Sequence, residues 1–264
     1  MKEAGSLTVV GTGMLIAGQV TQEALSAMES AEKLYFLVTD IVTSRWLGQL
    51  NPTAESLYDC YANGKSREKT YAEMVERILT SVRAGCSVVA AFYGHPGIFV
   101  APSHEAIRQA REEGHRAQML PGISAEDCLF ADLGIDPGER GCQSFEATDF
   151  LLRRRIFDPT SILVLWQIGG IGIFDFHRQP LWSRQGLEVL ERELLRHYPA
   201  DHEVVIYEAV PYPTLPPKVL RVPLSKMARA EVTIRSTLYV PPLPDRASDP
   251  EMRCALGIDD DEMG

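Results

Sequence analysis

AFYGHPGIFVAP, residues 91–102, is the stretch where an apolar run of this chain ends in a tight turn. The run before it, CSVVAAF (86–92), has the small and β-branched apolar residues of a buried strand. Tyr-Gly-His-Pro-Gly follows at 93–97, and glycine and proline are the residues that break strands and build turns. Glycine also allows backbone to approach a ligand closely, and proline fixes a rigid turn. We therefore expect this strand to stop at a binding site.

Strand-like and helix-like segments alternate along the first half of the chain. Apolar runs such as SLTVV are separated by longer amphipathic stretches, which is the pattern of a mostly parallel α/β sheet. Thr21 is a plausible helix N-cap, and Gly85 and Gly114 are plausible helix stops. We expect strands at 6–10, 33–38, 86–92 and 116–120, and helices at 21–30, 67–84, 103–114 and 123–133.

The pattern changes near residue 141, where helices become scarce and strands follow one another closely. We expect an N-terminal α/β domain over residues 1–140 and a second α/β domain over 141–243, with one long helix around 185–197. The remaining residues, 244–264, are acidic and have little apolar surface to bury, so they are expected to form a tail.

Composition narrows the class of protein. The 264 residues are 45% hydrophobic and 23% charged, which is typical of a soluble globular chain. The formal charge of −10 argues against nucleic-acid binding, which draws its affinity from Lys and Arg beside phosphates. There is no signal-peptide pattern and no apolar run of about 18 residues, so we expect a protein that is neither secreted nor membrane-spanning.

The five cysteines and six histidines form no metal-binding pattern. The cysteines have no CxxC pair and their number is odd, which favours reduced thiols and a cytoplasmic location. The histidines include no HxxxH pair, and no zinc-finger spacing is present. We expect no metal site.

Three glycine or proline clusters follow predicted strands: GTG at 11–13, YGHPG at 93–97 and LPGIS at 120–124. Open α/β sheets bind ligands in the crevice beyond the carboxyl ends of their strands, so three such turns at one edge indicate a ligand site. GTGMLIAG is not a dinucleotide motif, because Ile16 stands where the third glycine belongs. No GxxxxGK[ST] occurs, which excludes the P-loop.

Taken in order, VVGTGM (9–14), YGHPG, PGIS and STLYVP (236–241) resemble the motifs of the tetrapyrrole methylase superfamily over most of residues 6–243. The resemblance implies a class III methyltransferase of two α/β domains that binds S-adenosylmethionine in the cleft between them and releases S-adenosylhomocysteine. By the same resemblance, the residues at the cofactor are Gly11, Gly13, Tyr93, His95, Ile98, Phe99, Ser124, Ala125, Gln167, Tyr207, Ser236 and Thr237.

His95 stands where the superfamily usually has the aspartate of a Gly-Asp-Pro turn, and YGHPGIF resembles the borosin branch, the peptide backbone α-N-methyltransferases. That branch also carries a tyrosine and arginine cluster before a long helix. Here the cluster is Tyr58 and Tyr61 in LYDCYANG, then Arg67 and Tyr71, which at i, i+4 share one helix face. With Tyr93, these residues form the expected catalytic set.

The chemistry explains the need for such a cluster. A peptide nitrogen is a poor nucleophile because its lone pair is delocalised into the carbonyl group. Its methylation requires loss of the N–H proton and stabilisation of charge on the carbonyl oxygen. A free tyrosine has a pKa near 10, and a nearby Arg67 guanidinium favours the phenolate form. The guanidinium or a second phenol can hold the developing oxyanion. His95 is expected either to donate to the methionine carboxylate or to brace its turn.

Several borosin enzymes carry their substrate as a hydrophobic core peptide at their own C-terminus. Residues 244–264 contain no such run, so we expect a separate precursor peptide, with a homodimer that forms a heterotetramer with its precursor. Two alternatives remain open. One is a tetrapyrrole or precorrin methylase, whose carboxylate-rich substrate calls for several Arg or Lys side chains. The other is a catalytically idle cofactor-binding scaffold.

Overall fold

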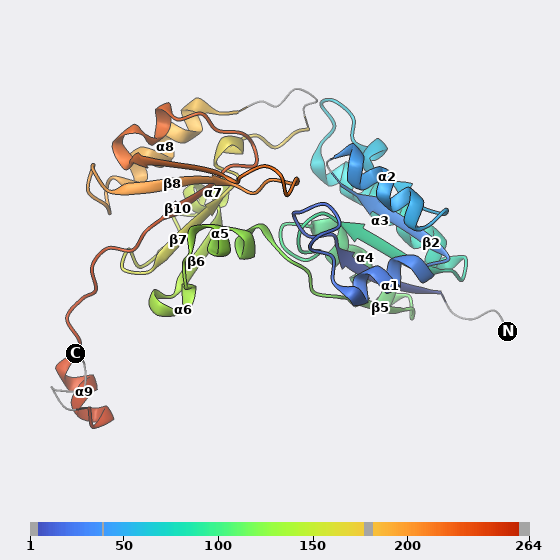
Figure 1. Cartoon of the computed structure of the whole chain (residues 1–264), viewed down its shortest axis with the longest axis horizontal. Coiled ribbons are helices and arrows are strands. Elements are labelled where there is room, and N and C mark those ends of the chain that lie inside the picture. Colours follow the sequence, from blue (N-terminus) through green and yellow to red (C-terminus); the bar gives the residue numbers. More distant parts are fainter. Residues whose placement is uncertain (1–4, 39, 177–181, 259–264) are drawn as a thin grey trace.

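The computed structural model describes residues 5–38, 40–176 and 182–258, which form two α/β halves lying side by side (Figure 1). The first half is built on a fully parallel sheet of order β3-β2-β4-β1-β5. Its strands are β1 (Ser6–Gly11), β2 (Lys33–Leu37), β3 (Glu55–Ser56), β4 (Ser87–Phe92) and β5 (Arg116–Met119).

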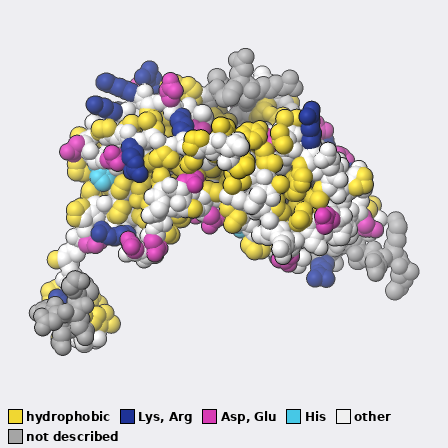
Figure 2. Space-filling view, in the orientation of Figure 1, with side chains coloured by type: hydrophobic (Ala, Val, Ile, Leu, Met, Phe, Trp, Pro, Cys, Tyr) yellow, Lys and Arg dark blue, Asp and Glu magenta, His cyan; other side chains and the backbone are white. Residues whose placement is uncertain are grey.

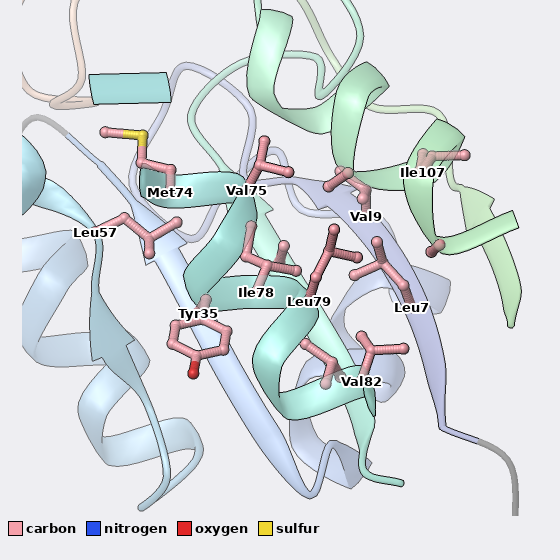
Figure 3. Close-up of a cluster of buried hydrophobic side chains, with 14 of the residues drawn as sticks. Leu7, Val9, Tyr35, Leu57, Met74, Val75, Ile78, Leu79, Val82 and Ile107 are labelled. Atoms are coloured by element: carbon pink, nitrogen blue, oxygen red, sulfur yellow. The ribbon is translucent and has the colours of Figure 1, made fainter. Parts of the chain in front are cut away.

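Helices cover both faces of this sheet, which explains why its central strands are apolar throughout. On one face, α3 (Arg67–Arg83) and α4 (Ala101–Glu112) pack against alternate residues of the strands, including Leu7 and Val9 of β1 (Figure 3). On the other face, α1 (Gln22–Ser30) and α2 (Ile41–Leu50) bury Met28 and Leu47 against the sheet.

The helix boundaries follow from local capping. The Thr21 side chain accepts a hydrogen bond from the Ala24 amide at the start of α1, as expected. Ser66 caps α3 in the same way, which sets Arg67 as the first residue of that helix. Gly85 and Gly114 follow α3 and α4 with φ of 91° and 84°, so both helix stops are confirmed.

The second half has a mixed sheet of order β6-β7-β10-β8-β9, in which only β6 and β7 are parallel. One face is covered by the helices α7 and α8 and by the 3-10 helix η3, and the other by α5, whose Leu129 packs on Val164 and Val205. The strands are β6 (Cys142–Glu146), β7 (Ile162–Trp166), β8 (Glu203–Glu208), β9 (Lys218–Pro223) and β10 (Thr237–Val240). The helices are α5 (Ala125–Leu133), α6 (Pro137–Arg140), α7 (Ala147–Leu152), α8 (Arg184–Leu194) and η3 (Leu224–Arg229).

Because α5 packs on the second sheet, the apolar core of the second half begins before residue 141; a division at 140/141 stays a proposal. The expected tail contains a short helix, α9 (Pro250–Leu256), which buries none of its residues and stands away from both sheets (Figure 1). Residues 259–264 of that tail lie outside the described part. Among the described helices, none combines the length and apolar character needed to cross a membrane.

Candidate active site

Three neighbouring strand ends meet at one edge of the first sheet. β4, β1 and β5 lie side by side and lead into the YGHPG, GTG and LPGIS turns. Gly94 donates its amide to the Gly13 carbonyl at 2.9 Å, and a Cβ on Gly11 would lie 2.3 Å from the Gly94 carbonyl oxygen. A Cβ on Gly122 would lie 3.3 Å from the Gly11 Cα. The expectation that these turns share one sheet edge is confirmed, and their glycines allow the close approach.

Two histidines brace the YGHPG turn. The His95 Nδ1 accepts from the Gly97 amide at 3.0 Å, and the His104 Nε2 lies 2.8 Å from the Gly97 carbonyl oxygen. Positive φ falls at Gly94 and Phe99, at 70° and 55°, and not at His95. Of the two expected roles of His95, bracing the turn therefore has an observed hydrogen bond, and donation to a cofactor carboxylate stays a prediction.

A cleft lined by residues of both halves, with about 810 Å³ of space that includes its open mouth, lies between them. Seven of the expected cofactor residues line it: Tyr93, His95, Ile98, Phe99, Ser124, Ala125 and Gln167. Ser124 caps α5, where its hydroxyl accepts from the Asp127 amide at 3.1 Å, so the N-terminus of that helix faces the cleft. The Phe99 ring lies 6.0 Å from Trp166 of β7, so both halves supply aromatic surface.

The other expected cofactor residues do not line this cleft. Gly13 lines an adjoining cavity, and Gly11 is buried beneath the turns. Tyr207 is buried and donates its hydroxyl to the Asp132 Oδ2 at 2.6 Å. Ser236 and Thr237 are also buried; the Ser236 hydroxyl donates to Glu208, and Thr237 pairs with Tyr207 in the sheet.

The expected catalytic residues gather at the same place. Tyr61, Tyr71 and Tyr93 line the cleft, and Arg67 lines an adjoining groove together with Tyr71. Tyr58 is half exposed and lies outside the lining, with its ring 5.6 Å from that of Tyr61. Within the described ranges no carboxylate pairs with Arg67, so its charge is available to the phenols.

The surroundings of Tyr61 and Tyr93 favour the neutral form of these two phenols. Burial, followed by the neighbouring Tyr71 and Tyr93 hydroxyls, raises the pKa of Tyr61, and Arg67 opposes the rise. Burial and then Tyr71 also raise the pKa of Tyr93, against the lowering effect of Arg235 and Arg67. Desolvation therefore outweighs the arginine effect at both phenols.

Two residues of the second half, Phe176 and Arg235, lie near the tyrosine cluster. Their local sequence does not predict this position. Phe176 stacks on Tyr61 with ring centroids 4.7 Å apart, and its carbonyl accepts from the Gly64 amide at 3.1 Å. Arg235 lines the cavity that adjoins Tyr93. The segment that ends in Phe176 is thus held beside the N-terminus of α3, where Ser66 and Asp175 form an isolated bridge.

Comparisons with known proteins agree with this architecture. Residues 6–228 match the family model described as Tetrapyrrole (Corrin/Porphyrin) Methylases. Among solved structures, a uroporphyrin-III-C-methyltransferase from Thermus thermophilus has a TM-score of 0.62 and 17% identity, and covers 90% of this chain and 93% of that one. At this identity the likeness shows the fold alone.

Curated relatives are closer in sequence. The chain is 46% identical to the Gymnopus fusipes "methyltransferase/ribosomally synthesized cyclic peptide gymnopeptides precursor", over 95% of this chain and 60% of that protein. It is 45% identical to the methyltransferase/omphalotin A precursor of Omphalotus olearius, over 94% of this chain and 60% of that protein. It is 40% identical to the methyltransferase/type I borosin cyclic peptide precursor of Serendipita vermifera subsp. bescii, over 96% of this chain and 63% of that protein. The chain thus spans about 60% of the length of these relatives.

Proposed function

The chain belongs to the tetrapyrrole (corrin/porphyrin) methylase family, and we propose that it transfers methyl groups from S-adenosylmethionine to backbone amide nitrogens of a peptide supplied to it in trans. The relatives at 40–46% identity support methyl transfer to a peptide, because they are named as methyltransferases joined to cyclic peptide precursors. The observation that carries the proposal is the cluster of Tyr61, Tyr71 and Tyr93 beside Arg67, on the wall of the cleft that the expected cofactor residues line.

The residues of the cleft fit S-adenosylmethionine. The faces of Tyr93, Phe99 and Trp166 suit a sulfonium cation and an adenine ring. The N-terminus of α5, which begins at Ala125, suits the methionine carboxylate because helix N-termini attract negative charge. Glu126, which also lines the cleft, suits the methionine ammonium group.

Cofactor and chain have separate tasks in the reaction. When bound, S-adenosylmethionine supplies an electrophilic methyl group and leaves as S-adenosylhomocysteine once that methyl is bonded to nitrogen. A tyrosine of the cluster, as phenolate, accepts the amide proton as the N–H bond breaks. Arg67 or a second phenol holds the negative charge on the amide oxygen, as an oxyanion hole does. The phenol then returns its proton to water.

Charge distribution favours a peptide over a tetrapyrrole substrate. Among the described residues, no Lys or Arg lines the cleft. The two adjoining cavities hold one arginine each, Arg67 and Arg235, which are few positive charges for a carboxylate-rich macrocycle. Hydrophobic side chains gather over the middle of the face drawn in Figure 2, between the two halves.

Mass spectrometry tests the proposal. The purified chain is mixed with S-adenosylmethionine and apolar peptides, including core segments of the relatives' precursors. We expect peptide products heavier by whole methyl groups, located on backbone nitrogens by fragmentation, and no methyl group on the chain itself. Arg67→Met is expected to reduce kcat by about 100-fold, the size of a lost oxyanion donor, with cofactor affinity unchanged. Arg108→Met, on the exposed face of α4, is the matched control.

Methyl transfer to tetrapyrroles but to no peptide would contradict the proposal, and so would methylation of the chain's own residues 244–264. Cofactor binding without transfer to any acceptor would favour the scaffold alternative. Light scattering with and without peptide tests the proposed homodimer and heterotetramer.

A further inference from the structure

A second cavity adjoins the proposed cofactor cleft. Tyr93 belongs to the lining of both, so its side chain forms part of the wall between them. The first half contributes Thr12, Gly13, Asp40 and Thr43 to this cavity, and the second half contributes Arg235. Arg235 thus brings a charge from the second half to the wall that Tyr93 forms.

The turn that carries Arg235 is fixed on both sides. Within it, the Thr233 amide donates to the Ser236 hydroxyl at 2.8 Å, and the Arg235 amide donates to the Thr233 hydroxyl at 3.1 Å. The Ser236 hydroxyl donates in turn to the buried Glu208, and the Ser236 carbonyl accepts from the Ile168 amide at 3.0 Å. The Arg235 backbone is therefore held in place although its side chain is exposed.

The charge of Arg235 is not neutralised by a carboxylate. Across the described ranges, no Asp or Glu forms an ion pair with it. Asp40, the acidic residue of the second cavity, accepts from the Thr43 amide at 2.7 Å as the N-cap of α2. Arg235 and Arg67 both lower the pKa of Tyr93, and Arg67 lowers that of Tyr61. The other titratable residues that line these two cavities are Tyr61, Tyr71, His95, Glu126 and Asp40.

We infer that Arg235 is a positioning residue that acts through Tyr93, and that Tyr93 is the phenol that takes the proton from the substrate amide. The inference rests on the proposed function and assigns the base that the proposed function leaves open. Tyr93 first loses its proton to water, with Arg235 and Arg67 offsetting the charge. The N–H bond then breaks toward the Tyr93 oxygen as the nitrogen bonds the methyl group and the sulfur–methyl bond breaks.

The first experiment needs no substrate or cofactor. Tyrosine Cζ signals are followed by NMR against pH in the ligand-free chain, and the Tyr93→Phe variant identifies the Tyr93 signal. Arg235→Met removes the charge and keeps a side chain of similar length, so it should move the Tyr93 titration upward by about 0.5 to 1 pH unit, the size of one partly screened charge. Arg235→Lys should restore most of the shift. Arg221→Met, an arginine of β9 paired with Glu203, is the control and should leave Tyr93 unchanged.

The second experiment measures methyl transfer. Arg235→Met should lower kcat for the peptide by about 3- to 10-fold at neutral pH, the factor of that shift, with the rise of kcat displaced to higher pH and cofactor affinity unchanged. Tyr93→Phe should lose more activity than Tyr61→Phe or Tyr71→Phe.

An unmoved Tyr93 titration in a folded Arg235→Met variant overturns the inference, whatever the activity. A Tyr93→Phe variant with full kcat overturns the assignment of the base. If the chain methylates no peptide, the proposed function fails, and the NMR titration still decides whether Arg235 acts on Tyr93.

Discussion

Tyr198 and Tyr207 are both buried phenols of the second half, yet their hydroxyls have different surroundings. The Tyr207 hydroxyl donates to Asp132 at 2.6 Å, whereas the Tyr198 hydroxyl has no hydrogen-bond partner among residues 5–38, 40–176 and 182–258. A buried polar group without a partner keeps its full desolvation cost. The same substitution should therefore have opposite effects at the two positions.

We expect Tyr198→Phe to leave the free energy of unfolding unchanged or to raise it by up to about 1 kcal/mol, because the ring contacts with Phe157 and His202 remain. Tyr207→Phe should lower it by about 1 to 2 kcal/mol, because a hydrogen bond to a carboxylate is lost. Urea unfolding of both variants measures the difference. A loss of stability in Tyr198→Phe equal to that in Tyr207→Phe would show that the Tyr198 hydroxyl has a partner.

At the scale of elements, the proposed cofactor edge of the first sheet depends on how closely three strand ends approach one another. Gly11 ends β1 under the YGHPG turn, and its added Cβ would also lie 2.8 Å from the Pro96 Cδ. Both neighbours are rigid, one a carbonyl and the other a proline ring. An alanine at this position must therefore push the YGHPG turn away from the GTG turn.

We expect Gly11→Ala to lower the free energy of unfolding by about 1 to 3 kcal/mol through overpacking, and to weaken cofactor binding because the displaced turn lines the cleft. Gly48→Ala is the matched control, since Gly48 lies in α2 and an added Cβ there would have no atom of the described residues within 4 Å. Alanine favours a helix, so this control should gain about 0.5 to 1 kcal/mol. Urea unfolding and calorimetric cofactor titration measure both variants. If the two variants bind the cofactor equally well, the contact between the YGHPG and GTG turns does not contribute to cofactor binding.

Elements with strong local signals are the ones that the sequence predicts. β1, β4 and β5 are apolar runs followed directly by glycine or proline turns, and parallel strands end at one edge, so the site edge follows from the sequence. The sequence does not predict α2. That helix contains Val42, Thr43 and Gly48, which are poor helix formers, and buries only Thr43 and Leu47, so its periodicity is weak. Capping by Asp40 and packing of Leu47 stabilise it.

The candidate site is predictable to a similar degree. The i, i+4 spacing places Arg67 and Tyr71 on one face of α3, and the family resemblance adds Tyr61 and Tyr93. Phe176 and Arg235 cannot be found in this way, because each meets its partner only when the two halves lie together. Local sequence contains no information about such long-range contacts. Tyr207, Ser236 and Thr237 have the expected residue types, but their side chains are buried away from the cleft.

At the scale of the whole molecule, burial raises the pKa of thiols and phenols in both halves. Desolvation is the largest cause that raises the pKa of three thiols and five phenols: Cys60, Cys128, Cys142, Tyr61, Tyr93, Tyr198, Tyr207 and Tyr239. For Cys142 the raised pKa is about 11. In the unfolded chain these groups return to ordinary values, about 8.5 for thiols and about 10 for phenols. The folded state therefore holds protons that the unfolded state releases.

The sign of the effect follows from this difference. Below about pH 8 both states are protonated, so the contribution of these groups to stability is fully present. As pH rises, the unfolded state binds fewer protons than the folded state, and the free energy of unfolding falls by at most about 1.4 kcal/mol per pH unit for each group. We expect a shallow fall above about pH 8.5 and a steeper one above about pH 10, measured by urea unfolding across a pH series. Tyr207→Phe should flatten the steeper part, and a constant stability from about pH 8 to about pH 10.5 would contradict the argument.

The same pH range governs the proposed reaction in the opposite sense. Methyl transfer that needs a phenolate should become faster as pH rises, while the folded chain becomes less stable. The rate at fixed temperature should then pass through a maximum whose alkaline side reflects unfolding. The proposed cofactor product would bind only the folded state, so saturating S-adenosylhomocysteine should move the stability loss of the chain to higher pH. Circular dichroism melting curves with and without this product, recorded beside initial rates, measure both sides. A fall in activity at an alkaline pH where the melting temperature is unchanged would contradict this argument. The loss of activity would then not result from unfolding driven by the buried phenols and thiols.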